Sequence, residues 1–565
     1  MKDPISRRDF VRQSMGWTVL VATGCATNER GTEGAATGSP PHPADPIDDA
    51  PDFANAVRQD GGLPFHKSFT GDDFRRAHKW LIDPETALSA LPGGKLPEPT
   101  ERVPLVVVGG GLGGLASAWL LKDLSPVLLE QAPRFGGNAK GERWRASTYG
   151  IGAAYYIQPD EGDDIDRIYE QIGIKGKARK LEVPDPVEYR GTVFSKFWTG
   201  EASPADAAKF QKFVERMHHY AKDEYPDIPI EDEKNREAVA ALDKRSLRDV
   251  VTEWLDGSVP EALRAALQNY CYSSMGAGWQ EVSAAGAINF LAGEEFGVLA
   301  LPGGNGAMTR AFWQALRRDL PEDRLRTGCF VFRVQDTKDG VLVAYEDPAG
   351  TVRTLLARAA VLACPKYVVK QIVPTMEPDR EKAIAALRWR AYMVVNVLVR
   401  RGLAEDFYDM YLLRDGAVLE SGSVPTRATD VILGNWARVP GLSDQSVLTL
   451  YWPFPYDSGR ADILFRPGGA FQALSAQVEV QVREVLALLK LAPDDVEQVR
   501  MTRFGHAVPV SAVGFIAAGH ADVLRRPIGG RIFFVNQDNW ALPAVETCLT
   551  EAIAFAPQVR AALGS

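Results

Sequence analysis

The chain has 565 residues, of which 45% are hydrophobic and 24% are charged, values close to globular averages. This composition excludes a disordered chain, a fibrous chain and a disulfide scaffold, and the length allows about three to five domains. With 64 basic and 73 acidic residues the net charge is −9, which argues against nucleic acid as the main partner because phosphate binding needs clustered positive charge.

Residues 1–30 predict an export signal. Arg7 and Arg8 lie in the run Ser6-Arg7-Arg8-Asp9-Phe10-Val11-Arg12, which resembles the twin-arginine export motif. The apolar stretch from Met15 to Ala22 is too short to anchor the chain across a bilayer. Cys25 ends a run that resembles a lipoprotein cleavage box, and the sequence leaves its lipidation open. We expect export to the periplasm or cell envelope, with or without a membrane tether through Cys25.

Residues 31–100 follow as an expected flexible N-terminal extension, rich in Ala, Gly, Pro and Asp near its start. Within it, the pattern from Asp72 to Leu81 predicts a helix. No later stretch has about 18 uninterrupted apolar residues, so no transmembrane helix is expected. The cysteines after Cys25 are scattered, without a metal-like spacing, and we expect most of them to be buried apolar residues: Cys271, Cys329, Cys364 and Cys548.

The strongest local signal is a glycine-rich turn between an apolar strand and a helix, in the run Val106-Val107-Val108-Gly109-Gly110-Gly111-Leu112-Gly113-Gly114. Gly109 permits the tight turn, Gly111 lets the backbone approach a pyrophosphate, and Gly114 lets the helix pack close to the strand. A second strand at 126–129 ends at Glu130, where a carboxylate would accept hydrogen bonds from ribose hydroxyls. The pattern predicts a dinucleotide site.

The residues after Glu130 identify the type of dinucleotide. The run Arg134-Phe135-Gly136-Gly137-Asn138 resembles flavin enzymes of the amine oxidase and phytoene desaturase superfamily. The resemblance implies FAD, with the glycine pair near the pyrophosphate and Arg134 supporting the adenosine end. The family often has Arg at the position of Asn138.

Five further segments resemble motifs of this superfamily in the same order along the chain. They are 151–156 near the flavin ring, the Pro-Gly-Gly turn at 301–305 before a helix through 308–316, the adenine-contacting strand at 330–334, the strand-to-Pro segment at 361–365, and the final motif at 530–535 with 543–546. The last motif implies a helix whose N-terminus faces the flavin, where its dipole stabilises negative charge. The FAD-binding residues so implied are Gly109, Gly111, Gly113, Gly114, Glu130, Gln131, Arg134, Gly136, Gly137, Asn138, Ala153, Ala154, Val331, Asp538 and Val545.

The expected fold is α/β, with a discontinuous Rossmann-type FAD-binding domain and an inserted substrate domain of mixed sheet plus helices. After the signal and extension, we expect the FAD-binding domain to be assembled from three segments, at 104–155, 301–375 and 501–565. Between them we expect a mostly helical substrate or cap region at 156–300 and a substrate domain at 376–500. Apolar patterns predict helices at 210–222, 261–272 and 545–556, and strands at 329–334, 341–345, 360–363, 393–399, 447–451 and 531–535.

The chemistry of the substrate side is less well marked. Candidate cavity walls are aromatic, at Trp198, Tyr270, Tyr272, Trp279, Trp436, Tyr451, Trp452 and Trp540. His506, Trp540 and Trp452 are the candidate catalytic residues, with a neutral His506 able to accept a proton from a protonated amine. Arg400, Arg438 and Arg503 are candidates to bind a substrate carboxylate.

Two positions depart from a plain amine oxidase. Relatives often have a cage Tyr where this chain has Ala544, and many have a Lys that positions water near the flavin, for which no equivalent is evident. Lys366 reads as a surface lysine.

Two enzymatic functions and a non-enzymatic one remain open. The first is oxidation of a C–N bond of an amine or amino acid, giving an imine that water hydrolyses, with electrons passing to oxygen, a quinone or a redox protein. The second is desaturation or isomerisation of an apolar substrate, which requires a long apolar tunnel. The third is a non-catalytic flavin-binding lipoprotein or partner subunit. No metal site is expected.

Overall fold

The computed structural model describes residues 44–48, 53, 56–58, 61–403, 406–414, 427–438, 444–454, 463 and 469–564. The predicted export signal, with Arg7, Arg8 and Cys25, lies outside these residues. Among the helices of the described residues, none is long and apolar enough to cross a membrane. Cys271 and Cys329 are buried and Cys364 and Cys548 are half-buried, and all four are free thiols.

The first of two large sheets has seven strands and surrounds the glycine-rich turn. Its order is β14 (Leu325–Arg326), β6 (Val127–Leu129), β5 (Glu101–Val108), β17 (Val352–Leu362), β16 (Gly340–Glu346) and β15 (Phe330–Thr337), with β23 (Ile532–Phe534) paired to β17. The strands β14, β6, β5, β17 and β23 pair in parallel, whereas β15, β16 and β17 form an antiparallel meander.

Both faces of this sheet are buried, which explains the uninterrupted apolar run of β5. Leu105 and Val107 pack with α4 (Leu112–Leu120), α11 (Asn305–Asp319) and α17 (Val545–Leu563) on one face. Val106 and Val108 pack on the other face with α12 (Lys366–Ile372) and the meander. Alternate side chains of a strand point to opposite faces, so a doubly covered strand must be apolar throughout. The predicted doubly wound fold is confirmed.

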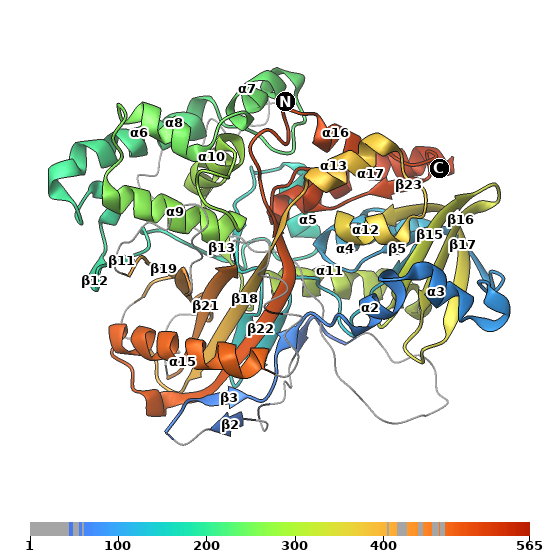
Figure 1. The fold of residues 1–565 in the computed structure, drawn as a ribbon, viewed down its shortest axis with the longest axis horizontal. Helices are drawn as coiled ribbons and strands as arrows, with labels where there is room; N and C mark the ends of the chain where they lie inside the picture. Colours follow the sequence, from blue (N-terminus) through green and yellow to red (C-terminus); the bar gives the residue numbers. More distant parts are fainter. Residues whose placement is uncertain are drawn as a thin grey trace.

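The second large sheet is mostly antiparallel and has ten strands (Figure 1). Its order is β12 (Thr192–Phe194), β11 (Val187–Tyr189), β19 (Asp409–Leu412), β20 (Asp430–Leu433), β21 (Ser446–Phe454), β18 (Trp389–Val399), β22 (Val496–Pro509), β3 (Pro64–His66) and β2 (Ala56–Arg58), with β4 (Thr70–Gly71) paired to β22. One face packs on α15 (Ala470–Leu488).

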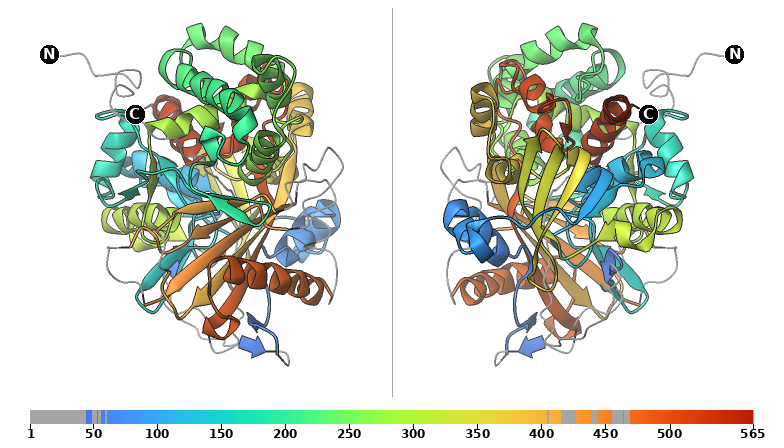
Figure 2. Two further views of the ribbon diagram at one scale, coloured as in Figure 1. Left: turned by 90° about the vertical axis from the view of Figure 1, so that its left-hand side faces the viewer. Right: turned by 90° about the vertical axis from the view of Figure 1, so that its right-hand side faces the viewer.

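The opposite face of the second sheet is covered by a helical region, and Figures 1 and 2 show these helices on the side away from α15. The region contains α6 (Ala207–Asp223), α7 (Glu233–Asp243), α8 (Leu247–Trp254), α9 (Glu261–Met275) and α10 (Ala284–Gly293). The predicted helices at 210–222, 261–272 and 545–556 are confirmed as segments of α6, α9 and α17, and the six predicted strands overlap β15, β16, β17, β18, β21 and β23.

The remaining helices and strands are short. They are α3 (Pro84–Ser89), α5 (Asp164–Gln171), α13 (Pro378–Ala386) and α16 (His520–Arg525), the sheet of β1 (Ile47–Asp48), β7 (Gly141–Trp144) and β8 (Ser147–Gly150), and the sheet of β9 (Tyr156–Ile157), β10 (Arg179–Lys180) and β13 (Val298–Ala300).

The expected flexible extension, residues 31–100, contains strands and helices from Ile47 onward. Strand β3 and strand β4 both pair with β22, and the predicted helix at 72–81 is confirmed as α2 (Arg75–Leu81). The side chains of Phe65 and Trp80 are buried. Apolar side chains of this segment pack against the two sheets and hold it in a defined position. Its Pro and Gly content gives no indication of this packing.

Candidate functional site

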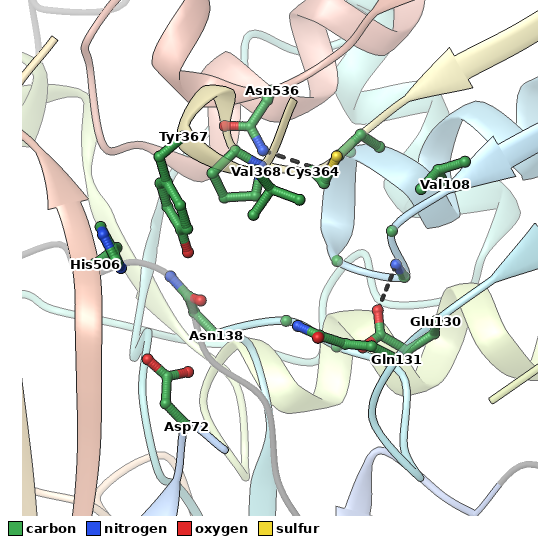
Figure 3. Close-up of a pocket in the computed structure, with 18 of the residues that line it drawn as sticks. Asp72, Val108, Glu130, Gln131, Asn138, Cys364, Tyr367, Val368, His506 and Asn536 are labelled. Carbon is green, nitrogen blue, oxygen red and sulfur yellow. Dashed lines mark hydrogen bonds between the residues drawn. The ribbon is translucent and has the colours of Figure 1, made fainter. Parts of the chain in front are cut away.

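A cavity of about 470 Å³, here called the dinucleotide cavity, lies at the carboxyl ends of β5, β6 and β17. The N-termini of α4, α12 and α17 and the residues around α2 complete its wall. Figure 3 shows side chains from these separate segments converging on one space. In a doubly wound sheet this edge is where ligands bind.

The glycine-rich turn presents bare backbone to this cavity. Gly109 has a φ of +103°, and a Cβ on Gly114 would lie 1.9 Å from the carbonyl oxygen of Gly109. Gly111 and Gly137 approach each other so closely that a Cβ on Gly137 would lie 3.1 Å from the Cα of Gly111. The absence of side chains here allows a pyrophosphate to reach the N-terminus of α4, where backbone N–H groups favour an anion.

Glu130 is held rigidly at the adjacent wall. Its Oε2 atom accepts a hydrogen bond of 2.7 Å from the backbone N–H of Gly110, and its Oε1 atom accepts one of 2.8 Å from that of Ala132. The side chain is buried and lines the cavity. A carboxylate fixed in this way has further lone pairs available for ribose hydroxyls.

Asn138 contributes a buried side-chain amide to the cavity wall. Its side chain is buried and lines the cavity, and its Oδ1 atom has no hydrogen-bond partner among the described residues. The glycine cradle, the fixed carboxylate and this polar atom fit the FAD implied by the sequence. Twelve of the predicted site residues line the cavity: Gly109, Gly111, Gly113, Glu130, Gln131, Gly136, Gly137, Asn138, Ala153, Val331, His506 and Val545.

Four predicted FAD-binding residues do not line this cavity. Gly114 instead sits behind the turn, and Ala154 lines a separate space of about 20 Å³. Arg134 is buried and donates to the backbone carbonyls of Gly141 at 3.2 Å and Pro46 at 3.4 Å, so it holds these two loops together. Asp538 is buried beside Lys366, and its neighbour Asn536 lines the cavity in its place.

Lys366 corrects the expectation of a surface lysine. Its side chain is only 1% exposed, and its Nζ atom lies 2.8 Å from Oδ1 of Asp538. The backbone N–H of Lys366 donates to Oδ2 of the same carboxylate at 2.6 Å. This buried ion pair joins the start of α12 to the segment after β23, and Lys366 does not line the dinucleotide cavity.

Two of the three candidate catalytic residues lie elsewhere in the core. Trp540 donates from Nε1 to Oε1 of Glu551 at 2.9 Å, inside the helix–loop packing around α17. Trp452 points from β21 toward α15 and stacks on Phe454. Its neighbour Tyr451 points to the opposite face of the sheet, as adjacent residues of a strand do. The remaining aromatic candidates are buried and do not line the dinucleotide cavity, although Tyr451 lines the small space bordered by Ala154. They are Trp198, Tyr270, Tyr272, Trp279, Trp436 and Tyr451.

His506 does line the dinucleotide cavity, where its ring stacks on Tyr367 with centroids 3.7 Å apart. Figure 3 shows His506 and Tyr367 facing the same space as Asp72. Sequence reasoning missed Asp72, Tyr367 and Asn536. The apolar spacing within 72–81 was the available signal for the first, whereas Tyr367 follows the strand-to-Pro segment without any motif of its own.

A second cavity of about 410 Å³, here called the acidic chamber, lies next to the dinucleotide cavity. The two share Tyr155 and Val545 in their walls, at the end of the dinucleotide cavity that the sequence assigns to the flavin ring. Seven carboxylate residues line the chamber: Asp160, Asp163, Asp227, Glu231, Asp232, Glu294 and Glu546. No Lys or Arg is among the described residues that line either cavity, so Arg400, Arg438 and Arg503 lie elsewhere.

Behind Glu294 the second sheet buries three more carboxylates. Burial raises the pKa of Asp185 to about 8 and that of Asp430 to about 7, and burial together with the charges of Asp430 and Asp185 raises the pKa of Asp409 well above its usual range. Neither carboxylate oxygen of Asp409 has a hydrogen-bond partner among the described residues. Asp185 and Asp409 therefore hold their protons near neutral pH, so these buried groups add less negative charge behind the chamber than ionised carboxylates would.

Comparisons with known proteins agree with this geometry. The family model of flavin-containing amine oxidoreductases matches residues 112–535. The oxidoreductase PigB of Serratia sp. (strain ATCC 39006) is 23% identical over 515 aligned residues, covering 81% of this chain and 75% of that protein.

Solved structures share the fold. A putrescine oxidase with bound putrescine has a TM-score of 0.60 at 17% identity and covers 82% of this chain and 100% of its own. The cyclohexylamine oxidase of Brevibacterium oxydans has a TM-score of 0.58 at 18% identity and covers 81% of this chain and 99% of its own.

Proposed function

Because the chain belongs to the family of flavin-containing amine oxidoreductases and is an FAD-dependent oxidoreductase, we propose that it oxidises a C–N bond of a cationic amine. The acidic chamber is the observation that carries this proposal. A primary or secondary amine is positively charged near neutral pH, and a cavity lined by carboxylates attracts such a cation.

The position of the chamber supports its assignment to the substrate. It meets the dinucleotide cavity at Tyr155 and Val545, and Val545 is the first residue of α17. The N-cap residue of α17, Ala544, makes no side-chain cap, so the first N–H groups of the helix and its positive dipole end remain available to an anionic partner. When bound, FAD accepts the hydride equivalent removed from the substrate.

The chain's own residues then have two tasks. The carboxylates attract and orient the ammonium group, while the buried walls formed by Tyr155, Leu542 and Phe290 limit the access of water. The resulting imine is hydrolysed by water, and the electrons pass to oxygen, a quinone or a redox protein.

The lining residues also discriminate between substrate classes. An amino acid needs a cation for its carboxylate, and no Lys or Arg is found among the described lining residues. An apolar substrate would displace water from the seven carboxylates without offering them a charged or hydrogen-bonding partner, and this desolvation costs free energy. We therefore rank amines above amino acids, and both above apolar molecules.

The experiment is an anaerobic titration of the holoenzyme, monitored through the visible absorption of its flavin. Amines should bleach the oxidised band, whereas the alcohols of the same carbon skeleton should not. E231Q should raise the apparent dissociation constant for amines about two- to fivefold, because it removes one exposed charge of the chamber wall. Glu98→Gln, a control at an exposed position outside both cavities, should have no effect.

A spectrum that no amine bleaches would reject amine oxidation, and bleaching by an apolar molecule instead would support the desaturase alternative. Admission of air after bleaching tests the electron acceptor. Rapid return of the oxidised band identifies oxygen, and slow return points to a quinone or protein acceptor.

We also propose export by the twin-arginine route, on the basis of Arg7 and Arg8 in the sequence motif. Replacing both by Lys should leave the flavoprotein in the cytoplasmic fraction. An unchanged distribution between fractions would reject this route. Labelling with a radioactive fatty acid would decide whether Cys25 carries a lipid.

A further inference from the structure

A segment that precedes the family match forms one wall of the dinucleotide cavity. The family model begins at residue 112, yet Asp72, Asp73, Phe74, Ala77 and the following turn of α2 line the cavity. Residues 70–82, here called the clamp, therefore lie beside the cofactor site although the glycine-rich turn comes about 40 residues later.

The N-terminal end of the clamp is attached to the second sheet. Thr70 and Gly71 pair in parallel with Thr502 and Arg503 of β22, and the backbone N–H of Asp72 donates to the carbonyl of Arg503 at 2.9 Å. A Cβ on Gly71 would lie 2.2 Å from that same carbonyl, so only glycine allows this approach. The carboxylate of Asp72 accepts a 2.6 Å hydrogen bond from the N–H of Gly505, next to His506.

The C-terminal end of the clamp is attached to the first sheet through Glu346, at the end of β16. Arg76 donates to the backbone carbonyl of Gly328 at 2.8 Å and forms an ion pair with Glu346. Lys79 also pairs with the Glu346 carboxylate, and Trp80 donates to it from Nε1 at 2.8 Å. The Trp80 ring stacks on Phe332 with centroids 4.0 Å apart and planes only 6° apart.

Helix α2 thus presents two different faces. Arg76, Lys79 and Trp80 fasten one face to the meander. Phe74, Ala77, His78 and Leu81, which follow the i, i+3, i+4, i+7 spacing, line the cavity on the other. Beside them in the cavity wall lie Cys329, Phe330 and Val331, the strand that the sequence assigns to the adenine. Anchors on one face and cavity contacts on the other are the arrangement expected of a cover over a ligand.

We propose that the clamp retains FAD by covering its adenosine half, and that the cofactor cannot leave until α2 detaches from Glu346. The clamp bridges the two large sheets on either side of the cavity, so it closes the route between them. This role adds a cofactor-retaining element outside the region of the chain that the family model matches, and it is independent of which substrate the enzyme oxidises.

The neighbouring residues Arg75 and Arg76 provide a matched pair of variants for the test. The Arg76 side chain is 26% exposed and anchors α2 to Glu346, whereas the Arg75 side chain is 71% exposed and pairs with Asp73 within the clamp itself. After dilution of the holoenzyme, free flavin fluorescence measures the rate of FAD release. R76A should release FAD at least tenfold faster than the wild type, and R75A should match the wild type.

A second variant separates retention from folding. Ala77 lines the cavity and also packs against the cluster that contains Trp80 and Phe332, so A77F should crowd the ligand while the polar anchors of α2 at Glu346 stay in place. We expect its FAD dissociation constant to rise at least tenfold while the unfolding temperature of the protein stripped of flavin stays unchanged. If R76A and A77F both hold FAD as tightly as the wild type, α2 does not cover the cofactor and the proposal is wrong.

Discussion

The two cavities of this protein are built in opposite ways. The dinucleotide cavity is lined by exposed backbone from glycines close together in sequence, within 109–113 and at 136–137. The acidic chamber has a wall of charged side chains from segments spread between residues 155 and 550. The first shape is determined by backbone conformation, and the second by which distant side chains the fold brings together. A motif can therefore report the cofactor, while the substrate becomes visible only in three dimensions.

The largest effect is expected when a side chain is added to the glycine-rich turn that borders the dinucleotide cavity. Replacing Gly114 by Ala places a Cβ 1.9 Å from the Gly109 carbonyl, so α4 must move away from the turn. We expect G114A to be purified almost free of flavin, measured as the ratio of absorbance near 450 nm to that at 280 nm. G469A, whose Cβ would meet no atom within 4 Å, should keep its full flavin content. A flavin-replete G114A would show that the cradle is not needed.

The buried carboxyl group of Asp185 should lower the free energy of unfolding at high pH. The Oδ1 atom of Asp185 accepts from the Tyr408 N–H at 3.0 Å, and Oδ2 has no partner among the described residues, so burial raises its pKa to about 8. The nearby Asp406 adds to the rise, and Asp185 in turn raises the pKa of Asp409. The folded chain holds a proton that the unfolded chain releases above pH ~4, so the free energy of unfolding falls as pH rises toward 8.

The variant D185N tests this cost. Asn keeps the acceptor for Tyr408 and removes the titration, so the fall, up to about 1.4 kcal/mol per pH unit for one proton, should be absent from D185N and should appear as the difference between the two proteins. Denaturant unfolding at several pH values between 5 and 8 measures it. Parallel pH profiles of wild type and D185N would mean that Asp185 is ionised in the folded protein. Flavin content should not change, because Asp185 lines neither large cavity.

The smallest effect is expected at the junction of the two cavities. Ala544 lines the chamber where many relatives have a cage Tyr, so A544Y should narrow the chamber and leave the cofactor in place. We expect kcat/KM for bulky amines to fall about tenfold, or about 1.4 kcal/mol, with a smaller loss for short amines. Steady-state kinetics with an amine series of increasing size measures this. An equal loss for all amines would instead indicate a disturbed α17 N-terminus.

The difference between the two cavities also explains which of the residues singled out in the sequence line the dinucleotide cavity. Residues 109–113, Glu130 and Val545 line the dinucleotide cavity because their positions depend on local backbone and on strand order. Trp452 and Asp538 do not, because the direction of a side chain in a sheet or the partner of a buried acid depends on residues far away. Lys366 is buried only because Asp538 lies 172 positions further along the chain, a pairing that no local pattern encodes.

The clamp is a second case in which the sequence predicts an element but not its role. The spacing of Phe74, Ala77 and Leu81 predicts a helix with one apolar face, and that helix is present. These side chains pack against core clusters and also line the dinucleotide cavity, and spacing alone cannot reveal the second role. Its anchor, Glu346, is buried on a different strand about 270 residues away.

The first sheet has a consequence for how the protein is made. Its long strand β17 pairs with β5 and also with β23, which lies more than 400 residues after β5 in the sequence. The helix α17, whose first residue lines both cavities, follows β23. A ribosome must therefore have synthesised every residue from β5 to α17 before the cofactor site is complete, and a chain that stops before α17 lacks part of the walls of both cavities.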